Sequence, residues 1–522
     1  MDKRLIYIGV IVAALPVVIL RDFTPANELR YLSIADEALR NHALFAFTNH
    51  GVPYADKPPL YLWIVMLCRG VAGGHRVWLL SLFSLLPALG ILRVMDGWTR
   101  EAADDGSRRA AMTMTVTSGL FLTSALTIRM DMLMTFFIVM ALREAWWIMR
   151  GTGRPGTARL LFALYTFLAV FTKGPLGLLI PLCGIAAYVF LVRKGGGRVR
   201  LFFRVWNWQV WTVVLSLCLA WFAAAYREGG ADYLSDLLLH QTVGRAVNSF
   251  HHANPPYYYA VCIWYILAPW SLPVIGICVA SLRKTVVKSD LQKFFMTVAA
   301  TTFILLSCIS SKLQVYMLPA IPFLTYPAAM LAPRFKESPW LRVAVAVTAL
   351  ALSLSLPALL LASAISDAPY LSDWTARVAA TVLTLTGACS LHAVCKRPAR
   401  ALPGVTARIG TGMLVAMFVA AFAFPDINKE TGYGALCDEA LRESRRYGLT
   451  DFRARRIGRA QNMDVYLKRP VTVMPGDKVP RTGTGEGWVM LTKRKYADCF
   501  RGRETRVVGP YAIVVCQGSQ QK

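Results

Sequence analysis

A polar stretch near the start of the chain, residues 22–60, contains the side chains best suited to chemistry. It combines the acids Glu28 and Asp56 with the cations Arg30 and Lys57. Arginine offers a planar fork and lysine a point charge, and both suit phosphate oxygens. Because apolar segments flank the stretch, acids and bases at this depth indicate a site for an anionic, lipid-linked phosphate and a reaction on it. An ordinary solvated loop between two spans is the alternative interpretation.

The first half of this stretch predicts a helix that lies at the membrane surface. Leucine and alanine recur at helical spacing on one face between Glu28 and Asn41, and charged side chains occupy the other faces. Asn27 is a suitable cap for this helix, and Pro25 ends the preceding one. The apolar segment 59–72 is short for a span, so we expect it to be re-entrant or packed on the surface.

The composition indicates a polytopic membrane protein. The chain has 522 residues, of which 56% are hydrophobic and 17% are charged. Its net charge of +27 would suit a nucleic-acid partner, but Lys and Arg cluster in short loops between apolar segments, which is the positive-inside pattern and argues against one. We count about thirteen candidate transmembrane helices by length and hydropathy. They lie near residues 5–20, 75–95, 109–127, 131–149, 157–172, 174–192, 208–226, 257–282, 293–310, 313–332, 341–364, 375–395 and 407–424.

The basic loops assign the two sides of the membrane. They alternate regularly along the chain and fall on one side, which the charge rule makes cytoplasmic. The opposite side then holds two large loops, 21–74 and 227–256, and the short turns near Arg129, Lys173 and Lys312. An odd number of spans places the C-terminal tail on this outer side as well.

The tail, residues 426–522, has the composition of a soluble domain. A helix is expected at 431–446, where alanine and leucine recur at helical spacing. The predicted fold is therefore an α-helical polytopic membrane domain, 1–425, followed by a small α/β domain on the outer side. Three runs have the composition of strands, namely 470–474, 487–492 and 505–516.

Two motifs in the first outer loop resemble those of a known family. The chain reads Asn-Glu-Leu-Arg-Tyr at 27–31 and Tyr-Ala-Asp-Lys-Pro at 54–58. The GT-C membrane glycosyltransferases have Pro-Asp-Glu-x-x-Tyr and Tyr-x-Glu-Lys-Pro there. The resemblance is to the bacterial branch with the lipid A 4-amino-4-deoxy-L-arabinose transferase and relatives of protein O-mannosyltransferases. It implies an inner-membrane enzyme that moves a sugar, with inversion, from a polyprenyl-phosphate carrier to a lipid, glycan or protein acceptor on the periplasmic side.

The resemblance also implies roles for residues that bind the substrate. Arg30, Tyr54 and Lys57 would hold the phosphate of the carrier. For each cation taken alone, the alternative is a side chain that extends its charge to the membrane–water interface. Lys312 and Tyr316 match the family pattern Lys-x-x-x-Tyr-x-x-Pro. At this spacing they would share one helical face, and an interfacial anchor pair is the alternative.

Asn27 departs from the family pattern, which has at this position an Asp regarded as the catalytic carboxylate. An amide does not accept a proton at neutral pH, so Asn27 cannot be a general base. Three explanations are open. Glu28 or Asp131 takes over, the acceptor is an ionised phosphate or carboxylate that needs no base, or the enzyme is inactive. Asp131 lies in the second outer turn, where the family has an Asp, although a charge there is also typical of a span boundary.

The second large outer loop contains His240, Arg245, His251 and His252. Relatives place a His and an Arg in this loop, and some bind a divalent ion through the His and the acid before the Lys, here Asp56. The resemblance therefore implies Arg245 as a substrate contact, and Asp56 with His240 or His252 as metal ligands. The spacing of Cys and His does not by itself indicate zinc.

A transporter or flippase for a lipid-linked anion is the alternative function, because it would also need outer cations and many spans. Transporters tend to have internal repeats, and the sequence shows none. Arg143 and Glu144 are the clearest charged pair inside a predicted span. No glycine loop of the Walker type is visible, which fits a donor that is activated elsewhere and carried by a lipid.

Overall fold

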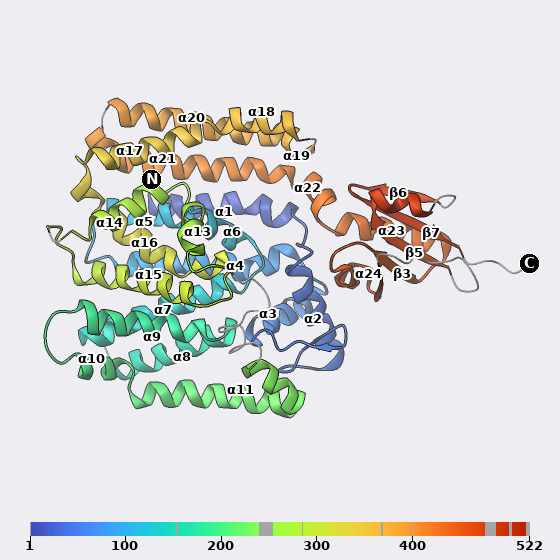
Figure 1. The fold of residues 1–522 in the computed structure, drawn as a ribbon, viewed down its shortest axis with the longest axis horizontal. Helices are drawn as coiled ribbons and strands as arrows, with labels where there is room; N and C mark the ends of the chain where they lie inside the picture. Colours follow the sequence, from blue (N-terminus) through green and yellow to red (C-terminus); the bar gives the residue numbers. More distant parts are fainter. Residues whose placement is uncertain are drawn as a thin grey trace, which may run out of the picture.

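We analysed a computed structural model of the chain. It describes residues 2–152, 155–239, 254–283, 285–366, 369–396, 398–475, 487–500 and 504–517. Most helices run roughly along one direction and form a bundle, and a small domain with a sheet extends from one end of it (Figure 1). The first outer loop lies at that same end, next to the small domain.

Several helices of the bundle are long and apolar enough to cross a membrane, so the chain is a multipass membrane protein. Among the described residues seven helical segments meet this test, and an eighth does if α17 (Pro339–Ser353) and α18 (Ser355–Ile365), bent by 44°, form one span. The seven are α1 (Lys3–Leu20), α4 (Val77–Trp98), α7 (Asp131–Arg150), the segment Arg198–Leu239 with α10 (Arg198–Val205) and α11 (Trp208–Ser235), α15 (Asp290–Cys308), α20 (Trp374–Lys396) and Pro403–Thr431, which includes most of α21 (Pro398–Ala420).

Two other predicted spans are helical but broken. The segment 109–127 divides into α5 (Asp105–Val116) and α6 (Gly119–Leu126), and the segment 257–282 into α13 (Tyr258–Ile266) and α14 (Ser271–Ala280). The two breaks meet, because the amide of Gly119 donates to the carbonyl of Ala268 at 2.8 Å and the indole of Trp270 donates to the hydroxyl of Thr117 at 2.8 Å. Backbone groups freed by the breaks are thereby satisfied inside the protein, as hydrocarbon surroundings require.

The first outer loop forms two helices and a small hairpin. The helix α2 (Glu28–Asn41) has the predicted bounds, and α3 (Leu60–Ala72) is a 13-residue helix in the short apolar segment. The strands β1 (Thr48–Asn49) and β2 (Val52–Pro53) form the hairpin between them. Ten of the 14 residues of α2 are buried by the rest of the protein. Its polar side chains are paired within the first outer loop, as Asp36 is with Arg69 and His75, or with the small domain, as Ser33 is with Asp464. That the helix lies at the membrane surface stays a prediction.

The small C-terminal domain has the predicted mixture of helix and strands. Its main helix is α23 (Gly434–Tyr447), and its five-stranded sheet has the order β4-β3-β5-β7-β6. Two strands pair parallel with β3 and the others pair antiparallel. The predicted run 505–516 is a hairpin of two strands that turns at Gly509, where φ is +52°. The strands are β3 (Asp451–Arg455), β4 (Val471–Met474), β5 (Trp488–Lys493), β6 (Thr505–Val508) and β7 (Tyr511–Cys516).

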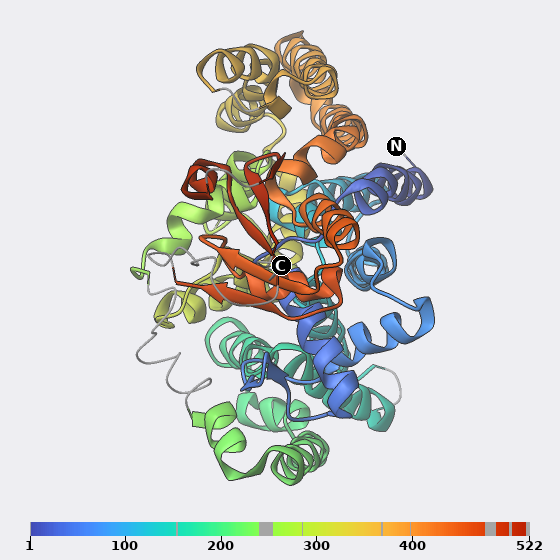
Figure 2. The same cartoon turned by 90° about the vertical axis from the view of Figure 1, so that its right-hand side faces the viewer.

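The strand β3 was not predicted, because only two of its five residues, Phe452 and Ala454, are apolar and the other three are charged. One of those three, Arg455, is buried with them. The domain is fixed against the first outer loop (Figures 1 and 2). Asp22 accepts hydrogen bonds from the amide of Gly434, at 2.8 Å, and from the hydroxyl of Tyr466. A common apolar core also joins α2 and α3 to the domain.

Candidate active site

Two adjoining cavities lie at the end of the bundle that faces the C-terminal domain. The polar cavity has a volume of about 330 Å³ and the apolar cavity about 450 Å³. Both are lined by Asp56, Lys57, Lys173, Ser311 and Tyr316. The polar cavity is completed by Asn27, Arg30, Tyr31, Arg129, Met130, Asp131, Leu313 and Arg459. The apolar cavity is completed by Ala55, Pro58, Val170, Gly174, Pro175, Leu176, Leu179, Trp221, Phe222, Leu237, Leu238 and Ile309.

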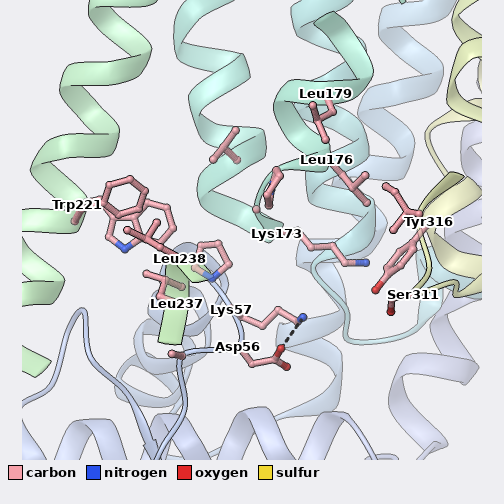
Figure 3. A pocket seen from close by; sticks show the side chains of 17 residues that line it. Asp56, Lys57, Lys173, Leu176, Leu179, Trp221, Leu237, Leu238, Ser311 and Tyr316 are labelled. Carbon is pink, nitrogen blue, oxygen red and sulfur yellow. Dashed lines mark ion pairs between the residues drawn. The ribbon is translucent and has the colours of Figure 1, made fainter. Parts of the chain in front are cut away.

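The two cavities meet at a set of polar groups. Figure 3 shows the amines of Lys57 and Lys173 pointing towards Tyr316, while Trp221 and Leu237 lie on the opposite side of the apolar cavity. Lys57, Lys173 and Tyr316 come from different segments of the chain, so the fold and not the local sequence brings them together. An arrangement with cations at one end and apolar side chains beyond them matches an amphiphile with an anionic head.

The first turn of α2 supplies Asn27, Arg30 and Tyr31 to the polar cavity. The guanidinium carbon of Arg30 lies 5.7 Å from the ring centres of both Tyr31 and Tyr54, which is within cation–π range. Among the described residues no acid forms an ion pair with Arg30, and its buried Nε has no hydrogen-bond partner there. Burial lowers the pKa of Arg30, but nearby Tyr54, Tyr31 and Asp56 more than offset this, so its pKa is raised.

The predicted phosphate-binding residues Tyr54 and Lys57 surround Asp56. The hydroxyl of Tyr54 donates to Oδ2 of Asp56 at 3.2 Å, and Nζ of Lys57 lies 3.5 Å from Oδ1. Burial raises the pKa of Tyr54 well above its usual value, and Asp56 raises it further. Tyr54 is therefore a neutral hydrogen-bond donor that lies behind the polar cavity and orients Asp56, rather than lining the cavity itself.

Asp131 is the second carboxylate of the polar cavity. It begins α7, and Lys173 ends the neighbouring helix α8 (Pro155–Lys173). Lys173 forms an ion pair with Oδ1 of Asp131, and Nε of Arg129 lies 3.1 Å from Oδ2. Nζ of Lys173 also lies 4.5 Å from the ring centre of Tyr316. Because both oxygens of Asp131 are engaged, a role as base would require one of these ion pairs to break.

Glu28 lies outside the polar cavity. One of its oxygens accepts from Nη1 of Arg21 at 2.7 Å and from the amide of Thr24 at 2.8 Å. The other accepts from the amide of Ile128 at 2.7 Å, and the residue is 1% exposed. These bonds hold the start of α2 against the second outer turn, so the geometry gives Glu28 a structural role in place of the predicted catalytic one.

Lys312 is also turned away from the cavity that its neighbours line. It is 2% exposed, and its amine donates to the carbonyls of Asn254, at 3.0 Å, and Ile309, at 2.5 Å. The expected helical face shared with Tyr316 is wrong, because the backbone is extended at Leu313 and only a 3-10 turn follows at Gln314–Met317. Tyr316 nevertheless reaches both cavities.

The predicted residues of the second outer loop, His240, Arg245, His251 and His252, lie outside the described residues. Of the predicted metal ligands only Asp56 is therefore placed. Within the described part of the chain no group of three or more His, Cys, Asp or Glu side chains is arranged to hold a metal. The divalent metal accordingly stays a prediction.

The polar cavity has a strong positive bias. Five basic side chains and two acidic ones line it. Sequence reasoning placed Arg129 and Lys173 in outer turns without assigning them to the site, and it missed Arg459. Nothing in the local sequence distinguishes Arg459, which lies in the C-terminal domain far along the chain from the first outer loop.

Comparisons with known proteins found two curated relatives and a solved structure with a similar fold. No protein-family model matches the chain. The chain is 26% identical over 340 residues to an undecaprenyl phosphate-α-4-amino-4-deoxy-L-arabinose arabinosyl transferase of Shewanella sediminis, a match that covers 62% of this chain and 59% of the relative. It is 23% identical over 300 residues to an uncharacterized protein of Aquifex aeolicus, with 57% of each covered. The matches thus span less than two thirds of the curated relatives.

A solved structure has the same fold over nearly the whole chain. ArnT from Cupriavidus metallidurans, bound to undecaprenyl phosphate, superposes with a TM-score of 0.76 and 16% identity, covering 98% of this chain and 97% of that one. The same protein in the apo state gives a TM-score of 0.75. The helical membrane domain and the small C-terminal domain are therefore those of a known fold, which confirms the predicted fold class at that level.

Proposed function

We propose that this chain is an inverting glycosyltransferase of the GT-C type, which moves a sugar from a polyprenyl-phosphate carrier to an acceptor. The observation that carries the proposal is the junction of the two cavities at Lys57 and Lys173. It offers cations for a phosphate and apolar walls for the lipid that bears it. The similar arabinosyl transferase, whose name includes undecaprenyl phosphate, and the ArnT structure with that lipid bound support the same donor class.

In this mechanism the carrier phosphate is the leaving group. Lys57 and Lys173 bind its oxygens, and Trp221, Leu237 and Leu238 contact the first isoprenyl units. As the bond to the sugar breaks, negative charge grows on the phosphate, and preorganised cations stabilise it without reorganisation. Asp131 positions Lys173 and Arg129 for this task through its two ion pairs.

The acceptor in this proposal is an anion, such as a phosphate or carboxylate, and it attacks the opposite face of the sugar. Asn27 cannot take a proton, and Glu28 lies outside the cavity. Of the two carboxylates that line it, Asp56 is paired with Lys57 and accepts from Tyr54, and Asp131 is held by two cations. An ionised acceptor needs no base, and the positive bias of the cavity attracts it. Of the three explanations for Asn27, this one agrees best with the contacts around it.

The proposed topology keeps about thirteen spans, with residues 1–425 as the membrane domain and 426–522 as the second domain. The site then faces the periplasm at the bacterial inner membrane. Reporters that are active only outside the cytoplasm should work after Glu228 and at the C-terminus and should fail after Gly196. A cytoplasmic C-terminus would contradict this arrangement.

The test of the function is transfer in detergent. Purified protein is mixed with undecaprenyl phosphate that carries a labelled sugar and with a phosphate-bearing lipid acceptor, and the labelled product is measured. The expected result is transfer by the wild type and not by a Lys57→Ala variant. A transporter would give no product under these conditions, and neither the geometry nor the comparisons favour that alternative.

A further inference from the structure

Arg459 belongs to the C-terminal domain and lines the polar cavity. Among the described residues it is the one residue of that domain that does so. It precedes the short helix η6 (Ala460–Met463) and has φ of +54°, a left-handed conformation that non-glycine residues seldom adopt. Its Nη1 donates to the carbonyl of Ala26 at 2.6 Å. Arg459 is thereby held beside Asn27, the residue that replaces the carboxylate of the family pattern.

The loop that carries Arg459 is fixed to the first outer loop. The hydroxyl of Ser33 donates to Asp464 at 2.9 Å, and Nε2 of His50 lies 3.1 Å from Oδ1 of Asn462. Both contacts lie within five residues of Arg459 in the chain and join it to α2 and the hairpin. The guanidinium is therefore preorganised at the cavity by the docking of the domain.

The guanidinium has capacity for a ligand. An arginine has five N–H donors, and a single bond to Ala26 uses one of them. In the described part of the chain no acid forms an ion pair with Arg459 or with Arg30, whereas Asp56 and Asp131 are paired with Lys57, Arg129 and Lys173. Arg30 and Arg459 line the same cavity beside Asn27.

We propose that Arg459 is a specificity-determining residue that binds the anionic group of the acceptor, opposite Arg30. The inference rests on the proposed function and adds that the C-terminal domain contributes to the active site. It also accounts for Asn27. A carboxylate there would attract both guanidiniums and neutralise them, whereas the amide leaves their forks for phosphate or carboxylate oxygens.

The experiment compares three variants in the detergent assay. Arg459→Gln removes the charge, Arg459→Lys keeps it without the fork, and Arg456→Gln is the matched control. Arg456 has the same side chain and a φ of +57° in the same segment, but it contacts the ring of Tyr496 and does not line the cavity. The readouts are KM for a phosphate-bearing lipid acceptor and the Kd for undecaprenyl phosphate.

Loss of a charge-assisted contact predicts that Arg459→Gln raises the acceptor KM about 10- to 150-fold. The Kd for undecaprenyl phosphate should stay unchanged, Arg459→Lys should be intermediate, and Arg456→Gln should match the wild type. If Arg459→Gln does not fold, Arg459→Lys decides the matter, because wild-type KM in that variant overturns the inference. The inference is also overturned if Arg459→Gln has the same acceptor KM as Arg456→Gln. It is overturned as well if Arg459→Gln raises the Kd for undecaprenyl phosphate as much as it raises the acceptor KM. A wild type without transfer would instead overturn the proposed function.

Discussion

A second charged pocket, the inner pocket, lies towards the other end of the same helices. It has the same balance of charges as the polar cavity. Five basic and two acidic side chains line each of them. The inner pocket has a volume of about 630 Å³, larger than the polar cavity of about 330 Å³. Its charged residues are Lys3, Arg93, Asp96, Arg100, Asp105, Arg108 and Arg143.

The difference lies in what surrounds the charges. In the inner pocket both acids bind Lys3 and Arg108. Among the described residues no aromatic side chain lines this pocket, and none of its lining residues is shared with the apolar cavity. In the polar cavity Arg30 lies between two tyrosine rings, and Lys57 and Lys173 also border the apolar cavity. The number of cations therefore does not identify a site for a lipid-linked phosphate. The position of the cations beside an apolar cavity identifies it.

The largest expected effect tests this comparison directly. Arg30→Ala combined with Lys57→Ala should reduce sugar transfer by about 10²–10⁴-fold, because each removes a charge-assisted contact. The matched double variant in the inner pocket, Arg93→Ala with Arg100→Ala, should stay within about twofold of the wild type, since both residues are exposed. Initial rates in detergent measure both. Equal losses in the two pairs would break the distinction between the pockets.

The second prediction concerns stability and separates Glu28 from the catalytic groups. Glu28→Gln leaves Arg21 buried without its partner, which should reduce the free energy of unfolding by about 3–5 kcal/mol. Thermal unfolding in detergent measures the change. The control replaces both charges, Arg21→Met with Glu28→Leu, and should recover part of the stability.

The rate per folded protein should change little in Glu28→Gln. Removal of a general base reduces a rate by about 10²–10⁴-fold. A loss of transfer rate of that size, at a temperature where the variant is folded, would show that Glu28 acts as the base. The pH–rate profile gives independent evidence. A phosphate acceptor is already charged throughout the pKa range of a carboxyl side chain, so it predicts no rise in rate across that range.

The third prediction reverses the charge balance of the polar cavity. Asn27→Asp places a carboxylate near Arg30 and Arg459, so the KM for an anionic acceptor should rise about tenfold, the size of one weakened charge-assisted contact. Asn27→Ser is the control, because it changes the shape without adding charge. An Asn27→Asp variant that turns over the anionic acceptor faster than the wild type would instead indicate that a base had been missing.

The sequence was sufficient for most elements, apart from β3 and the breaks within two predicted spans, and insufficient for the directions of single side chains. The hydrophobic period predicted α2 with its bounds, and the motifs named Arg30 and Lys57, which the fold brings to one cavity. Glu28 was misassigned because successive residues of a helix do not share a face, so Asn27 and Arg30 meet the cavity while Glu28 points to Arg21.

Contacts between distant segments could not be predicted from the sequence, for a different reason. Arg459 reaches Ala26 only because the C-terminal domain docks on α2, and no period or motif encodes that docking. Lys312 was misplaced because a helix was predicted to begin at the next residue, Leu313. The chain is extended there, and the next α-helix is α16 (Ala320–Leu331). Local patterns predict elements, and the packing of elements selects which charges face a cavity.

The smallest effect is expected at Lys3, in the inner pocket. Its amine lies 2.9 Å from Asp96 and 3.0 Å from Asp105, and its side chain is 23% exposed. Pairs that water reaches contribute about 0.2–1 kcal/mol, and salt screens them, so Lys3→Gln should lower the unfolding temperature slightly at low salt and less at high salt. Sugar transfer should not change, because Arg108 still pairs with Asp96 and no substrate group is expected there. Loss of transfer comparable to that of Lys57→Ala would mean that the inner pocket takes part in function, and position beside the apolar cavity would no longer separate the two regions.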